Sequence, residues 1–388
     1  MTLDRRNLLK QLGMGMAAGS FLRPVRASAA ANNSGTTEVA PIEHSGPIHL
    51  DRNENAYGAS KKAITAIQKS SNQASRYPDA KLLQNALAAH HSQNRTRSVQ
   101  PDQILPGCGS SDVLRMVASA FLRADKTLIL AAPTCALLSN DARKEGAEVV
   151  EVPLLKDHSH DLKSMLERAN QQSAAGLIYV CNPNSPTGTM TTRKNLEEFL
   201  GKVPPSFQVV IDEAYHEYAG GSGSYASFID RPAENPRVIV TRTFSAAYGL
   251  AGARVGYAVA SVPVAEKISK ESLLFAIGSA GIAAALAALD DQQHVEICAK
   301  RNFDDRQEFM NQVNARMLRA LDSHTNFVCL NVMRPAGEIL EHYQKNNFVL
   351  PALIPSLPTY LRISLGTPEE MKEFWRVWDL LGSHPMSM

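Results

Sequence analysis

The segment TRTFSAAYGLAGARVGYA occupies residues 241–258 of the 388-residue chain. Apolar runs flank a central loop of alanine and glycine, which predicts two buried strands joined by that loop. The loop carries a hydroxyl at Ser245 and a guanidinium at Arg254. These two groups can bind a phosphate-like anion together, the arginine through paired charge-assisted hydrogen bonds. Ala246, next to Ser245, contributes no functional group.

The same alternation of apolar runs and helical patterns extends over residues 74–260. The runs that predict buried strands are KTLILAAP, GAEVVEVPL, AGLIYVCNP, FQVVIDEAY, RVIVTRTF and RVGYAVAS. Strands buried on both faces and separated by helices favour a mostly parallel sheet covered by helices. NFVCLNV, FVLPAL and TYLRISL predict a smaller C-terminal α+β domain. The fold class is therefore α/β, and we expect ligands at the carboxyl edge of the parallel strands.

Residues 1–30 differ in composition from the rest of the chain. Arg5 and Arg6 precede a short apolar run, and Ala27 and Ala29 form an A-x-A site, a combination typical of a twin-arginine export signal. A basic N-terminus without a targeting role is the alternative. The signal predicts a periplasmic or secreted protein. A formal net charge of +2 argues against nucleic-acid partners and against membrane binding after export.

Two further segments carry candidate ligand-binding residues. PGCGSSDVL, residues 106–114, places Ser110 and Ser111 at a helix N-terminus, where backbone N–H groups bind anions, although a simple helix cap is the alternative. In VVIDEAY, Asp212 ends a buried strand and Tyr215 follows three residues later. A buried carboxylate needs a partner such as a protonated pyridine nitrogen, unless Asp212 only caps the next turn.

Eight ordered motifs, from about Leu50 to Gly366, define a resemblance. They are LDRNENAYG, RYPDA, PGCGSSDVL, APTC, CNPNSPTGT, IDEAYHEY, TRTFSAAYGLAGARVGYA and YLRISLGTPEE. The chain resembles the fold-type I pyridoxal-phosphate-dependent aminotransferases of class I and II, and most closely their histidinol-phosphate-aminotransferase-like branch. The polar composition of residues 31–48 predicts a linker. The domain organisation expected after it is a segment of the small domain at 49–73, a large cofactor-binding domain at 74–275, and bridging helices with the C-terminal small domain at 276–388.

The resemblance also implies roles for individual residues. Those expected to bind the cofactor phosphate are Ser110, Ser111, Ser245, Arg254 and, from a neighbouring subunit, Tyr57. Asp212 would pair with the pyridine nitrogen and Tyr215 with the phenolic oxygen of the ring. Arg362 would bind the α-carboxylate of an amino-acid substrate, for which a planar bidentate donor is suited, and Asn53 would line the substrate side. The role of Tyr57 implies a homodimer.

Four departures from the family pattern fall in this site. Ala246 stands at the position of the Schiff-base lysine. Cys135 replaces an aromatic residue that stacks on the ring, and Ser185 replaces an asparagine for which Asn184 or Asn182 could substitute. Pro351 and Ala352 stand where relatives often carry an arginine.

The alanine has the largest chemical consequence. Without the amine the cofactor cannot be covalently anchored, and a positioned acid and base that contributes roughly 10²–10⁴ in rate is lost. We therefore expect an exported protein that binds a small amino acid and holds pyridoxal phosphate non-covalently or as an external aldimine, with transamination impaired or absent. Ala246 could be native or engineered, and the chain could be a pseudoenzyme.

Two other functions stay open, a cofactor-independent condensation or cyclisation and non-catalytic ligand binding with no cofactor. Cys108, Cys135 and Cys181 lie on the same loops and could be a reactive thiol or simple packing residues. His158 and His160 are expected in a surface turn, and no metal site is predicted.

Overall fold

The structure is a computed structural model that describes residues 46–93 and 98–381. The predicted export signal and residues 31–45 of the predicted linker lie outside the described residues. The described residues cluster as one compact unit, and the predicted boundary between residues 275 and 276 stays a prediction.

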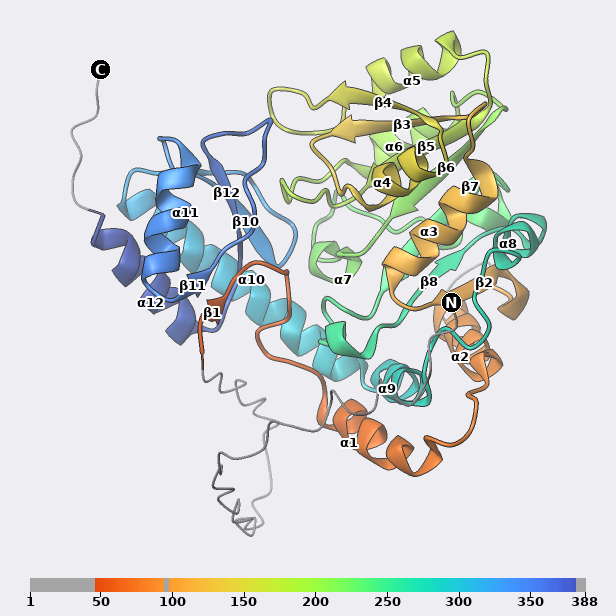
Figure 1. Ribbon diagram of the computed structural model, residues 1–388, viewed down its shortest axis with the longest axis horizontal. Coiled ribbons are helices and arrows are strands. Elements are labelled where there is room, and N and C mark those ends of the chain that lie inside the picture. The colour runs from red at the N-terminus through yellow and green to blue at the C-terminus, as the bar shows by residue number, and fades with distance from the viewer. Residues whose placement is uncertain (1–45, 94–97, 382–388) are drawn as a thin grey trace, which may run out of the picture. The chain divides into compact units, whose positions relative to one another are not determined.

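A seven-stranded sheet forms the large part of the fold (Figure 1). Its strands lie in the order β2-β8-β7-β6-β5-β3-β4. Their bounds are β2 Ile104–Gly107, β3 Thr127–Ala132, β4 Glu148–Pro153, β5 Gly176–Cys181, β6 Phe207–Asp212, β7 Val238–Thr243 and β8 Gly256–Val259. All neighbours from β7 to β4 are parallel, and β8 is antiparallel to both β7 and β2. The predicted mostly parallel sheet is confirmed.

Helices cover both faces of this sheet because successive side chains of each strand point to opposite faces. Ile178 and Val180 of β5 join one apolar core, whereas Leu177 and Tyr179 join the other. The first core includes residues of α1 Lys61–Ser70, α2 Ala80–Ser92, α5 Leu162–Gln171, α6 Arg193–Leu200 and α9 Ser279–Leu289. The second includes residues of α3 Ser110–Phe121, α4 Leu137–Lys144 and α8 Val262–Ser269.

A third core lies around a smaller antiparallel sheet with the order β12-β10-β9. Its strands are β9 Arg319–Ala320, β10 Phe327–Asn331 and β12 Tyr360–Ser364, and α11 Ala336–Lys345 and α12 Pro368–Asp379 contribute to the same core. Figure 1 shows these helices in blue beside β10 and β12. A separate parallel pair joins β1 Ile48–His49 to β11 Phe348–Val349, so the start of the described chain is attached to the C-terminal part.

The helix α10, Gln292–Ala315, links the cores. Val295 near its start belongs to the first core of the large sheet, and Phe309 and Val313 near its end belong to the core of the small sheet. Helices α9 and α10 occupy the segment expected to form a helix-rich bridge, and its role as a bridge between domains stays a prediction.

Candidate active site

An anion-binding cup forms where the loop after β7 meets the start of α3. Arg254 donates from Nη2 to the Ser111 hydroxyl at 3.2 Å and from Nη1 to the Ser245 hydroxyl at 3.4 Å. A further bond from Nη1 to the Ala251 carbonyl, at 3.0 Å, fixes the guanidinium. The cup therefore combines one cation, two hydroxyls and the N-terminus of a 12-residue helix, all of which favour an anion. Ser110 is the first residue of that helix.

Glycine is required where the backbone approaches this cup. Gly109 precedes α3 with φ +80°, and a β-carbon there would collide with the Arg254 guanidinium. A β-carbon on Gly256 would likewise collide with the backbone of Ser110. Both glycines let two chain segments approach closely enough to share one ligand.

Asp212 lies at the end of β6 and is 3% exposed. Its Oδ1 accepts from the Thr241 hydroxyl at 3.0 Å and the Ala214 N–H at 3.2 Å, and its Oδ2 accepts from the Tyr179 hydroxyl at 2.8 Å. Burial raises the pKa of Asp212, because these donors are all neutral and only partly offset the cost of desolvating the charge. A cationic donor at the remaining Oδ2 lone pair would stabilise the carboxylate.

The residues that follow Asp212 and Thr241 point to the opposite face of the sheet. There Glu213 and Arg242 form a buried ion pair, with Arg242 Nη2 at 2.8 Å and Nε at 3.1 Å from Glu213 Oε2. Because Asp212 and Thr241 are register partners on β6 and β7, this pair ties the two strand ends together directly behind the Asp212 carboxylate.

Asn53 of the N-terminal segment links Tyr215 to the small sheet by hydrogen bonds. Asn53 Nδ2 donates to the Tyr215 hydroxyl at 2.8 Å, and the Asn53 N–H donates to the Ser364 hydroxyl of β12 at 2.9 Å. Burial raises the pKa of Tyr215, so the phenol stays protonated. The rings of Phe327 and Tyr215 pack edge to face, with 5.2 Å between their centroids.

Arg362 lies on the same side of this cluster. It donates from Nη2 to the Asp51 carbonyl, and its guanidinium carbon lies 5.7 Å from the centre of the Phe327 ring. Its Nε is buried and has no hydrogen-bond partner. A buried N–H without an acceptor is costly, so this arginine is suited to a ligand carboxylate.

Other predicted residues make contacts within the chain. The Asn184 amide donates to Pro133 O at 3.1 Å and to Thr187 Oγ1 at 2.9 Å, and it accepts from Thr134 Oγ1 at 2.6 Å. Asn182 exchanges two hydrogen bonds with the Thr191 backbone. These amides hold the loop after β5, on which Ser185 is also buried. Their predicted roles toward a ligand stay predictions.

The Tyr57 hydroxyl donates to Asp305 of α10 in the same chain, at 2.7 Å. The guanidinium of Arg301 lies 5.0 Å from the centre of the Tyr57 ring. Contact with a neighbouring subunit would require the hydroxyl to leave Asp305, and this role of Tyr57 also stays a prediction.

Among the cysteines and histidines singled out in the sequence, Cys181 and His160 are buried, whereas Cys108, Cys135 and His158 are half-buried. Burial raises the pKa of Cys135 and of Cys181, which is unfavourable for a reactive thiolate at either position. The expectation of a surface turn is wrong for His160, which is 4% exposed because its loop folds onto Thr191, whose hydroxyl lies 2.7 Å from Nδ1. Burial lowers the pKa of His160 to about 4.

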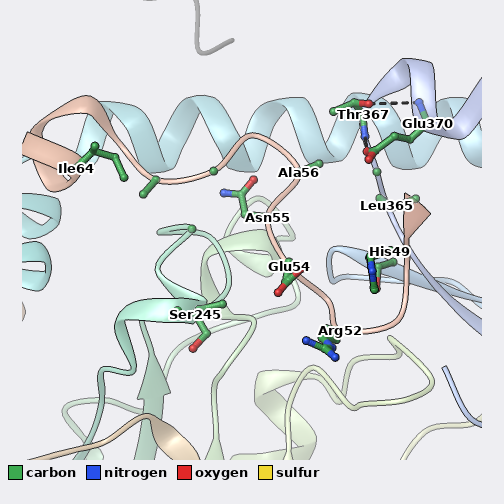
Figure 2. Close-up of a pocket in the computed structure, with 17 residues that line it drawn as sticks. His49, Arg52, Glu54, Asn55, Ala56, Ile64, Ser245, Leu365, Thr367 and Glu370 are labelled. Carbon is green, nitrogen blue, oxygen red and sulfur yellow. Dashed lines mark hydrogen bonds between the residues drawn. The ribbon is translucent and has the colours of Figure 1, made fainter. Parts of the chain in front are cut away.

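Ala246 is 3% exposed and packs in the first core of the large sheet. Ser245 beside it lines a cavity of about 390 Å³ that also contacts the N-terminal segment and the first turn of α12. Figure 2 shows Arg52, Glu54 and Asn55 along that segment, with Ser245 on the facing loop. No lysine is among the residues that line this cavity.

Sequence reasoning missed Tyr179, Thr241 and Ser364. Thr241 is the first residue of the segment 241–258, and its place opposite Asp212 follows only from the strand register. Within the described ranges, no group of three or more histidine, cysteine or acidic side chains is arranged to hold a metal ion. No helix among the same residues is long and apolar enough to cross a membrane.

Comparison with known proteins agrees with this fold. The chain belongs to the class I and II aminotransferases, whose family model matches residues 45–377. This is the fold-type I family of pyridoxal-phosphate enzymes that the motifs indicated.

Within the family the chain is similar to histidinol-phosphate aminotransferases. That of Bacillus velezensis is 36% identical over 329 residues, which are 84% of this chain and 89% of the relative. That of Bacillus licheniformis is 36% identical over 330 residues, with the same coverage. The crystal structure of histidinol-phosphate aminotransferase from Sinorhizobium meliloti in complex with pyridoxal-5'-phosphate matches with a TM-score of 0.79 and 27% identity, over 87% of this chain and 92% of that one.

Proposed function

We propose that this chain binds pyridoxal phosphate and a small amino acid but that its ordinary transamination is impaired or absent. The cup of Ser111, Ser245 and Arg254 has the charge and donors for the phosphate. Asp212 has a free lone pair and only neutral donors, which suits a protonated ring nitrogen. The site therefore fits the cofactor of the family.

When bound, the cofactor supplies an electron-withdrawing ring that weakens bonds to the α-carbon of an amino acid. Asp212 would keep the ring nitrogen protonated, because an ionic partner relieves the cost of burying its charge. Tyr215 would hold the phenolic oxygen, and Arg362 would orient the substrate through its α-carboxylate at the unpartnered Nε. Each of these functions is one of binding or orientation.

Ala246 is the observation that carries the proposed loss of activity. It directly follows Ser245 of the cup, and its methyl group is packed among apolar side chains. The position offers no amine to attach the cofactor and no base to move a proton. A chain with this site holds ligands without the covalent step.

We also propose that the chain is a homodimer. Tyr77, Leu273, Leu274 and Phe275 form an exposed apolar surface, on which the rings of Tyr77 and Phe275 stack with 4.2 Å between centroids. Leu274 is 88% exposed. Arg115 of α3 donates to the carbonyl of Glu271 at 3.1 Å, so this surface is attached to the helix that begins at the cup. Exposed apolar surfaces of this kind are typical of protein interfaces.

Export rests on the sequence of residues 1–30 alone. We propose delivery through the twin-arginine route, which carries folded proteins. Replacing Arg5 and Arg6 by lysine should retain the protein in the cytoplasm, as measured by cell fractionation. Unchanged export of that double variant would contradict the proposal.

The central test is an absorbance spectrum of the purified protein with pyridoxal phosphate, for the wild type, Ala246→Lys and Ala246→Met. The wild type should bind the cofactor, shown by a visible band that survives gel filtration but is lost on denaturation. A246K should retain the cofactor after borohydride reduction and denaturation, and should transaminate. A246M, which has the length but no amine, should do neither.

The outcomes separate the alternatives. A wild type that transaminates would contradict the proposed loss of activity. If the wild type and A246K both fail to bind the cofactor, the proposed function is wrong, and turnover of amino acids by cofactor-free protein would then favour a cofactor-independent reaction. Ligand-dependent stabilisation without turnover would favour a binding protein.

A further inference from the structure

We propose that Asn53 is a positioning residue: anchored by Ser364, it turns the Tyr215 hydroxyl so that its proton is donated to an ionised phenolic oxygen of the ligand. The inference rests on the proposed function, because it concerns the same cofactor site. It assigns to Asn53 a role in the direction of a hydrogen bond, in place of the substrate contact expected from the sequence.

The orientation of the Asn53 amide follows from its contacts with Ser364. The Ser364 hydroxyl accepts the Asn53 N–H at 2.9 Å and lies 3.1 Å from Asn53 Oδ1. Since the hydroxyl oxygen already accepts from the backbone, its own proton is available for Oδ1. In this orientation Nδ2 faces Tyr215, and the 2.8 Å bond runs from the amide N–H to the phenol oxygen.

The Tyr215 proton must therefore point elsewhere. A phenol that accepts one hydrogen bond still has its O–H to donate. In residues 46–93 and 98–381 no hydrogen bond takes up this proton, and the side chain is half-buried. This O–H is therefore available as a donor to an oxygen of the ligand.

The backbone of Asn53 shows that its position is held by its surroundings. Its φ is +56°, in the left-handed region that asparagine tolerates better than most residues. Asn326 Nδ2 donates to the Asn53 carbonyl at 2.8 Å and thereby fixes the peptide on its other side. Backbone held in this region by several contacts is typical of sites where a side chain must be aimed accurately.

The chain of donors runs from the small sheet to the large one. Ser364 lies on β12, Asn53 on the N-terminal segment, and Tyr215 directly after β6. With Asp212 on the same segment as Tyr215, the ring would meet a carboxylate at one atom and an O–H donor at another. This pairing selects a ligand with a protonated ring nitrogen and an ionised phenol oxygen.

The test compares the dissociation constants of pyridoxal phosphate and of its analogue without the phenolic oxygen, 3-deoxypyridoxal phosphate, measured by equilibrium dialysis. The wild type should bind pyridoxal phosphate about 10- to 100-fold more tightly than the analogue, since a hydrogen bond to a charged group is lost. Asn53→Asp keeps the shape of the side chain and tolerates the same backbone conformation, but its carboxylate accepts the hydrogen bond that the Tyr215 hydroxyl donates. The ratio should then fall to near 1 or reverse.

Three further variants complete the design. Tyr215→Phe should also give a ratio near 1, and Asn53→Asp in that background should change it no further. Asn53→Gly tolerates the backbone without the amide, and should lower the ratio if N53D does not fold. Asn347→Asp is the matched control, because Asn347 has φ +66° and is exposed, and it should keep the wild-type ratio.

A wild-type ratio in N53D or N53G, or a ratio near 1 in the wild type, would overturn the inference and leave the proposed function standing. Failure of the wild type to bind either compound would overturn both.

Discussion

The buried pair of Glu213 and Arg242 gives a prediction of stability that bears on the site. Glu213 is 1% and Arg242 is 6% exposed at the side chain, so neither charge has water as a substitute partner. We consider Glu213→Gln, which keeps the shape of the side chain and removes the charge. The new amide would place its N–H group against Arg242 or, in the other orientation, against the N–H of Phe228, which donates to Glu213 at 2.6 Å in the wild type. In either orientation one donor faces another donor.

The expected loss follows from what the substitution leaves behind. Arg242 would stay buried with a full charge and would lose its carboxylate partner, whereas neutral partners such as the Ser227 hydroxyl, at 2.6 Å, would remain. Breaking a buried pair by removal of one partner costs about 3–5 kcal/mol, and we expect E213Q to lose that much free energy of unfolding. An exposed pair behaves differently. Lys300 and Asp304 form such a pair and are 77% and 58% exposed. The variant Asp304→Asn should lose less than about 0.5 kcal/mol of free energy of unfolding.

Urea denaturation of cofactor-free protein, followed by circular dichroism, measures both variants. The double variant Glu213→Leu with Arg242→Met removes both charges, and it should recover most of the loss, because an apolar pair of similar volume is often neutral or stabilising. A loss below about 1 kcal/mol in E213Q, or a double variant less stable than E213Q, would refute the reasoning.

Two more predictions concern the cup and the pH dependence of stability. In Gly109→Ala the new methyl group collides with Arg254, so affinity for pyridoxal phosphate, measured by dialysis, should fall about 10-fold or more, whereas Gly223→Ala, with open space at its β-carbon, should bind as the wild type does. Burial raises the pKa of Glu217 from 4.5 to about 7, so the folded chain holds this proton more tightly than the unfolded chain. Stability should therefore decline as the pH rises from about 4.5 through 7, and the thermal midpoint of Glu217→Gln should lack that part of the decline. A decline of equal size in both proteins would contradict the assignment to Glu217.

The strands that could be predicted from the sequence are those with a continuous apolar and β-branched composition. All six apolar runs of residues 126–261 contain strands of the large sheet. β3 and β5 to β8 are buried along almost their whole length, whereas the edge strand β4 is buried only at Val152 and was predicted from its valines. β2, with Pro106 and Gly107, was not predicted, and its place at the sheet edge explains why proline is tolerated there. The antiparallel direction of β8 could not be predicted, since an antiparallel strand buried on both faces has the same composition as a parallel one.

For the site, motifs predicted which residues gather but not how they pair. Ser111, Ser245 and Arg254 meet as the motif order suggested. The partners of Asp212 and Tyr57 could not be found in this way, because Asp305 is 248 positions from Tyr57 and Thr241 is 29 from Asp212. Such pairs depend on register and on helix placement, which one sequence does not show.

The helix α10 has a consequence for how the chain folds. Its 24 residues span about 36 Å, with one end in the core of the large sheet and the other in that of the small sheet. Unfolding either core would remove the docking surface of half the helix, and the freed half would lose most of its support, since helices depend on tertiary packing. The two cores thus share one cooperative unit, and cofactor bound in the large part also protects the small sheet from unfolding.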